Sequence, residues 1–187
     1  YHLFTRPKLP TYRPRGRLDF QILYIASGKA HFYFNDEGID TVVPAGNMVV
    51  YRPKEPQKYI YYGTDQTEVF WVHFTGSNVT NILRSYGIKD DIRVINTGTS
   101  LEYTRLFKQM IYELQRCQYD YKEMLTLLLR QLFISIHRHL SMEHKIKNAY
   151  LDTEMEFFAE YNYDACREYK EALLDCARKE TEQKALV

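Results

Sequence analysis

The hydrophobic period of this sequence changes once, near residue 98. Before that point, short apolar runs alternate with turn residues such as Ser27-Gly28, Pro44-Ala45-Gly46 and Tyr62-Gly63. The runs are rich in β-branched and aromatic residues, which predicts strands over 19–26, 30–34, 41–43, 48–52, 58–62, 68–74 and 92–95. Several runs are apolar at successive positions, so both faces of those strands are expected to be covered. This pattern predicts a β-barrel or a β-sandwich.

After residue 98 the spacing becomes helical. Tyr103, Leu106, Met110 and Leu114 recur at helical intervals behind Ser100, a candidate N-cap. A second helix is predicted over about 122–142, and its apolar residues cover more than one stripe. One neighbouring helix cannot cover so wide a surface, so this helix needs a further apolar partner.

The charges nearly balance, with 25 Lys and Arg against 24 Asp and Glu, for a formal net charge of +1. Nucleic-acid-binding modules usually carry a clustered basic excess, so we do not expect this part of the protein to bind DNA itself. No apolar run approaches 18 residues, which argues against a membrane span.

The cysteines, Cys117, Cys166 and Cys176, are odd in number and widely spaced in helical sequence. Such spacing fits neither a disulfide framework nor a zinc site. It is typical of reduced thiols, so we expect a cytoplasmic protein.

Three motifs occur in an order that resembles one family. Arg-Pro-Arg-Gly at 13–16 precedes the strand that ends at Ser27-Gly28, Pro-Ala-Gly-Asn opens the run 44–53, and Trp-Val-His-Phe-Thr-Gly occupies 71–76. In order and spacing, together with the helix pair over 101–142, they resemble the N-terminal, cupin-type domain of AraC-family transcription regulators.

The resemblance implies a mostly β plus α fold, in which a cupin-like double-stranded β-barrel is followed by an α-helical dimerisation hairpin. The expected parts are an N-terminal arm at 1–14, the effector-binding barrel at 15–98, the hairpin at 99–145, and a linker with a helical tail at 146–187. The implied partners are a small effector, often a sugar, and a second copy of the chain. No cofactor is implied.

The end of the sequence departs from the family pattern. Residues 152–164 resemble the first helix of the family's DNA-binding domain, but 165–187 do not continue into a helix-turn-helix, because no glycine-bearing turn joins two apolar helices there. The chain is therefore either a fragment of a longer regulator or a regulator whose tail has been replaced. We favour a fragment, which would contact DNA only through a C-terminal domain that this chain lacks.

The surplus apolar surface of the second long helix predicts a homodimer, because family members pair subunits through this helix. The predicted contact consists of Met124, Leu125, Leu128 and Leu132.

Five residues are candidates for binding the effector. Trp71 and His73 share one face of their strand, and the resemblance makes Trp71 a stacking platform, although a single tryptophan can equally fill a core. Arg13 lies where the family has an effector-binding arginine, and its guanidinium suits vicinal hydroxyls or a carboxylate, although most arginines are solvated surface residues. Gln57 and Tyr59 share a face that the resemblance points inward, or they lie at the rim.

A cupin-fold metal enzyme, such as a sugar isomerase or a dioxygenase, is the alternative. It needs two histidines at alternate positions of one strand, but Tyr33 occupies the alternate position two residues after His31, and Gln57 stands where a later ligand is expected. We therefore predict neither a metal site nor an enzyme.

A third possibility is a structural dimerisation module whose own aromatic side chains fill the cavity.

Overall fold

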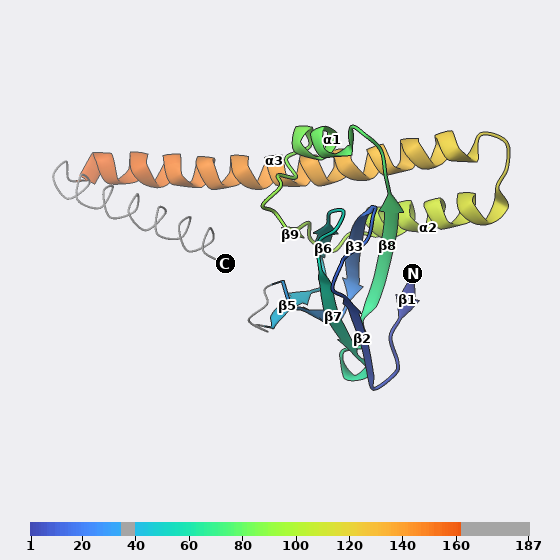
Figure 1. Ribbon diagram of the computed structural model, residues 1–187. Coiled ribbons are helices and arrows are strands. Elements are labelled where there is room, and N and C mark those ends of the chain that lie inside the picture. Colours follow the sequence, from blue (N-terminus) through green and yellow to red (C-terminus); the bar gives the residue numbers. More distant parts are fainter. Residues whose placement is uncertain (35–39, 162–187) are drawn as a thin grey trace. The chain divides into compact units, whose positions relative to one another are not determined.

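The computed structural model describes residues 1–34 and 40–161. The chain divides into two compact units, 1–140 and 141–187. All the strands described belong to the first unit (Figure 1). None of the described helices is long and apolar enough to span a membrane.

Two antiparallel sheets form the β part of the first unit. In spatial order, the first sheet contains β1 (His2–Leu3), β8 (Glu68–Phe74), β3 (Phe20–Ser27), β6 (Asn47–Tyr51) and β9 (Val94–Asn96). The second sheet contains β2 (Lys8–Arg13), β7 (Gln57–Tyr62), β4 (Lys29–Phe32) and β5 (Thr41–Pro44). A short 3-10 turn, η1 (Gly63–Asp65), joins β7 to β8. The predicted strands are thus present, and the mostly β plus α fold class is confirmed.

The two sheets pack face to face. Leu23, Val49 and Val69 of the first sheet are buried in one apolar cluster with Phe32 and Tyr59 of the second. This interior is the counterpart of the barrel interior that the sequence predicted, built between two separate sheets.

Among the described residues, three α-helices follow or interrupt the strands: α1 (Val79–Ser85), α2 (Leu101–Arg116) and α3 (Tyr121–Tyr161). Phe107 of α2 and Leu132 of α3 are buried in one cluster with Ile22, Met48 and Phe70 of the first sheet. The helices therefore cover the face of that sheet that points away from the second sheet (Figure 1). The first sheet is covered on both faces, as the uninterrupted apolar runs predicted.

The start of α2 is fixed to the first sheet. The Ser100 side chain accepts a hydrogen bond from the Glu102 amide (3.1 Å), which confirms Ser100 as the N-cap. The Ser100 amide donates to the Tyr24 hydroxyl (3.1 Å), and burial raises the pKa of Tyr24. This contact sets where the helical hairpin begins relative to β3.

The segment 1–14, expected to be a separate arm, is built into both sheets. β1 pairs with β8, and β2 pairs with β7 over its whole length. The sequence did not suggest a strand here, because proline has no amide to donate and Pro10 lies in the middle of β2. β2 is an edge strand of its sheet, and proline is tolerated there.

The predicted contact residues of the second long helix do not form one exposed surface. Leu132 is fully buried and Leu128 nearly so, because both pack into the core of their own chain, whereas Met124 is 45% exposed. Leu128 and Leu132 therefore have little surface left for a second subunit in this conformation, and the predicted dimer contact stays a prediction. The helix also continues beyond its expected end to Tyr161, and the tail 162–187 lies outside the described residues.

Replacing Leu132 by alanine tests this packing. Leu132→Ala should lower the free energy of unfolding by about 2–5 kcal/mol, because it leaves a cavity between α3 and the first sheet. The control Leu101→Ala removes the same atoms from a side chain that is 89% exposed, and it should change stability by less than about 0.5 kcal/mol. Denaturant unfolding of both variants provides the measurement, and equal losses would contradict the packing.

Candidate functional site

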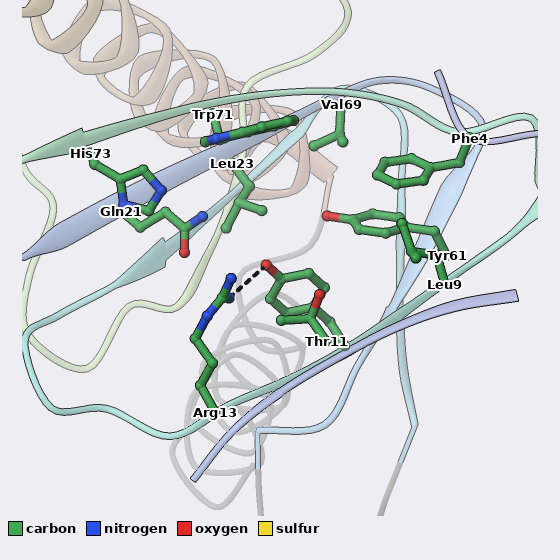
Figure 2. Close-up of a pocket in the computed structure, with 11 residues that line it drawn as sticks. Phe4, Leu9, Thr11, Arg13, Gln21, Leu23, Tyr61, Val69, Trp71 and His73 are labelled. Atoms are coloured by element: carbon green, nitrogen blue, oxygen red, sulfur yellow. Dashed lines mark hydrogen bonds between the residues drawn. The ribbon is translucent and has the colours of Figure 1, made fainter. Parts of the chain in front are cut away.

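A cavity of about 200 Å³ lies between the two sheets (Figure 2). Figure 2 shows Val69, Trp71 and His73 on one side of it, with Thr11 and Arg13 facing them. The residues that line it are Phe4, Leu9, Thr11, Arg13, Gln21, Leu23, Tyr59, Tyr61, Val69, Trp71 and His73. Four of the five predicted binding residues are thus brought together around one space.

A chain of hydrogen bonds forms the polar side of this cavity. The Arg13 Nη1 donates to Gln57 Oε1 (2.9 Å) and to the Tyr59 hydroxyl (3.2 Å, the dashed line in Figure 2). Gln57 Nε2 in turn donates to Gln21 Oε1 (3.1 Å). A guanidinium has five N–H groups. Among the described residues, only Nη1 of Arg13 donates hydrogen bonds. Arg13 therefore has donors left for an oxygen-bearing ligand.

Pairing of β2 with β7 places these groups. In the antiparallel register Arg13 lies opposite Gln57, and Thr11 lies opposite Tyr59. Opposite residues share a face of the sheet, so all four side chains point to the side of the first sheet. Gln57 was predicted to contact the effector, but it is fully buried and does not line the cavity. Its role here is to accept the hydrogen bond that positions Arg13.

Trp71 lies at the open part of the cavity and not in the core. Trp71 is 38% exposed, whereas Phe70, the preceding residue of β8, is fully buried against the helices. Alternation along the strand explains the difference, because Val69, Trp71 and His73 share the face that points away from the helices. The proposal that Trp71 fills a core does not fit this exposure.

His73 contacts a carboxylate at the edge of the cavity. Its Nδ1 is 3.5 Å from Asp19 Oδ2, and Asp19 is held by Arg17 (2.7 and 3.0 Å). Burial and the Arg17 charge lower the pKa of His73, while Asp19 opposes them. The imidazole is therefore predominantly neutral at neutral pH and can both donate and accept a hydrogen bond.

His31 belongs to a different place. On β4 it alternates with the buried Ala30 and Phe32, so it faces away from the cavity, and its Nδ1 lies 2.7 Å from Asp40 Oδ2. Within residues 1–34 and 40–161 no group of three or more His, Cys, Asp or Glu side chains is arranged to hold a metal ion. His31 and His73 thus do not converge as the ligands of a cupin metal site.

Several lining residues were not predicted. Leu9 and Thr11 belong to β2, the strand that was not predicted because it contains a proline. Phe4 also lines the cavity and stacks on Tyr61, with ring centroids 4.1 Å apart. The alternation of Leu9, Thr11 and Arg13 was the available signal, because residues two apart on a strand share a face. Gln21 and Leu23 follow from the same rule on β3.

Two facing sheets with a small cavity between them, covered by a helical hairpin, are typical of ligand-binding β domains. The family model for the AraC-like ligand binding domain matches residues 1–139. The chain belongs to this family, and the resemblance inferred from the motifs is confirmed.

Two solved structures of ToxT from Vibrio cholerae strain SCE256 are similar to this chain. The apo form of a ToxT variant has 14% identity and a TM-score of 0.45, over 79% of this chain and 54% of that protein. Wild-type ToxT with a bound unsaturated fatty acid has 15% identity and a TM-score of 0.41, over 69% of this chain and 49% of that protein. This chain thus spans about half the length of either structure. No curated protein matches the sequence.

The buried hydrogen bonds predict opposite effects for two substitutions in the same core. Gln57→Leu should cost about 1–3 kcal/mol of stability, because it removes the buried partner of Gln21 Oε1 and one of the two acceptors of Arg13 Nη1, which keeps the Tyr59 hydroxyl. Tyr51→Phe should be neutral or stabilising, because the Tyr51 hydroxyl is buried and makes no hydrogen bond among the described residues. Thermal unfolding compares the two, and a larger loss for Tyr51→Phe would contradict the network.

Proposed function

We propose that this chain is the effector-binding part of a bacterial transcription regulator, and that the cavity between its sheets binds a small polar metabolite, such as a sugar. The hydrogen-bonded chain of Arg13, Gln57 and Gln21, opposite Trp71, carries the proposal. Membership in the AraC-like ligand binding family supports it. The proposed role is non-covalent recognition, not catalysis.

The chemistry of the cavity favours a ligand with hydroxyl or carboxylate groups. The free donors of Arg13 form a fixed fork that matches two adjacent oxygens, and the neutral His73 adds a further polar partner. Trp71 offers a flat apolar surface on which the C–H face of a sugar ring can stack. The volume of about 200 Å³ corresponds to roughly seven water molecules at about 30 Å³ each, so the ligand is small.

Ligand binding would act through the N-terminal segment. Phe4, Leu9, Thr11 and Arg13 all line the cavity, and β2 is an edge strand held on one side only by β7. A ligand that contacts these residues binds best when the segment is docked, so it shifts the population toward the docked state. In the whole regulator, this shift would change the arrangement of the DNA-binding domains.

The partner in this mechanism is a second copy of the chain, paired through α3. Leu127 (53% exposed) and Ile134 (37%) lie on the face of α3 opposite to the buried Leu132, and Met124 (45%) borders that face, one turn before Leu127. Exposed apolar side chains on one face of a helix favour pairing with another apolar surface. This surface replaces the contact predicted from the sequence, of which it retains Met124.

DNA binding is assigned to a C-terminal domain that is not part of this chain. The formal net charge of +1 lacks the basic excess of a DNA-binding module. We place the whole regulator in the cytoplasm, where its operator and its effector are both present.

A melting screen tests the effector proposal. Sugars and small acids are added to the chain, and a ligand present at about 100 times its dissociation constant should add roughly 2.7 kcal/mol of stability. The ligand found should also change the emission of Trp71, which is the only tryptophan. Trp71→Leu should stay folded and bind about 1 kcal/mol more weakly, because it loses the aromatic contact.

Tyr119→Leu is the matched control for this experiment. Tyr119 is 95% exposed and lies between α2 and α3, far from the lining residues in the sequence, so its loss should not change affinity. If the ligand leaves the Trp71 emission of the unmutated chain unchanged, and if Trp71→Leu binds with unchanged affinity, Trp71 is not part of the site. An entire library without a stabilising member would contradict the effector proposal.

The dimer is tested by charge substitution on the exposed face of α3. Leu127→Asp combined with Ile134→Asp should yield monomers, because each aspartate would bury an unpaired charge at the contact. Leu101→Asp, at an 89% exposed position of α2, should leave the dimer intact. Light scattering measures the mass, and an unmutated chain that is monomeric at high micromolar concentration contradicts the pairing.

A further inference from the structure

A second and larger cavity lies on the other side of β8. Its volume is about 770 Å³, within the range of roughly 300–1,000 Å³ that is usual for small-molecule sites. β8, the loop 75–78, α1, α2 and α3 all contribute to its walls, and every contributing residue belongs to the unit 1–140. The cavity between the sheets is on the opposite face of the same strand.

The walls of this second cavity are mainly apolar. Phe74 comes from β8, Ile82 from α1, Met110 from α2, and Leu129 and Phe133 from α3. All five also pack on or belong to the apolar cluster between the helices and the first sheet, so the core holds their positions. Walls of this kind favour a hydrocarbon chain or ring and offer little to a sugar.

One edge of the cavity is cationic. Lys122, Thr126 and Arg130 follow one another at helical spacing along a single face of α3, beside the apolar row that contains Leu129 and Phe133. Lys122 and Arg130 are therefore roughly 12 Å apart along the axis, at about 1.5 Å per residue.

Neither cation is neutralised by a neighbour. Among the ion pairs of the described residues none includes Lys122 or Arg130, and the recorded contact of the Lys122 ammonium is with the Tyr121 ring, at 5.9 Å. Glu123 is exposed and adjacent in sequence to Lys122, so it points away from Lys122 by about a quarter of a helical turn. Two uncompensated positive charges thus border an apolar hollow.

We propose that this cavity is a second ligand site, which takes an anionic amphiphile: an acyl chain or comparable apolar body lies against β8 and the three helices, and its carboxylate pairs with Lys122 or Arg130. The charges select the sign of the head group, and the apolar walls select the body. The site is separate from the cavity between the sheets, and it does not depend on the function proposed for that cavity.

Calorimetric titration of the chain with dodecanoate, below its micellar concentration, tests the site. We expect saturable binding at one site per chain, and dodecyltrimethylammonium, with the same tail and the opposite charge, should bind at least about tenfold more weakly. Lys122→Gln combined with Arg130→Gln should weaken dodecanoate binding by about tenfold or more. Equal binding of the two detergents would show that the cations do not select the ligand, which overturns the proposal.

Matched variants locate the binding. Arg105→Gln combined with Lys108→Gln removes the same charge from exposed positions of α2 outside the cavity, and should leave dodecanoate affinity unchanged. Thr126→Trp should block binding, because the indole would extend over the cavity from an exposed position. Arg13→Ala should have no effect on dodecanoate, whereas it should impair the effector of the cavity between the sheets. Loss of dodecanoate binding in Arg13→Ala, with Thr126→Trp unaffected, would place the amphiphile between the sheets and overturn the second site.

Discussion

The burial of the first sheet on both faces is the constraint on which the rest of the structure depends. On β3, Ile22 and Tyr24 face the helices while Leu23 and Ile25 face the second sheet, and all four are almost completely buried. A strand that is apolar on both sides must be covered by two layers. The helical hairpin is therefore a structural requirement of the β domain, and the Tyr24–Ser100 hydrogen bond ties the two together.

This constraint also explains which parts of the fold the sequence predicts. The strands of the first sheet are recognisable because their apolar runs end at turn residues, and 68–74 was predicted with the bounds that β8 has. β2 was not predicted, because Pro7 and Pro10 argue against a strand and because its residues, which alternate between exposed and half-buried, form no apolar run. The burial of Leu128 and Leu132 was missed because an apolar helix surface shows how much must be covered, and does not show which neighbour covers it.

The sequence predicted four of the residues that line the candidate site, but it did not predict how their side chains are arranged. Arg13, Tyr59, Trp71 and His73 converge on the cavity because β2 pairs with β7 and because β8 lies in the facing sheet. Gln57 does not reach the cavity, yet its buried amide is satisfied on both sides, by Arg13 and by Gln21. A buried amide without partners costs about 1–3 kcal/mol, so this network fixes the orientation of Arg13. This network depends on which residue of β2 lies opposite which residue of β7, and the sequence alone does not show this strand register.

β8 is the element that the two cavities share. Trp71 and Val69 face the small polar cavity, Val72 and Phe74 face the large apolar one, and His73 borders both. Because a strand alternates its side chains, a ligand on either side contacts residues directly adjacent in sequence to those on the other. This same strand connects the N-terminal segment, through its pairing with β1, to the helical hairpin, through the contact of Phe74 with Phe133.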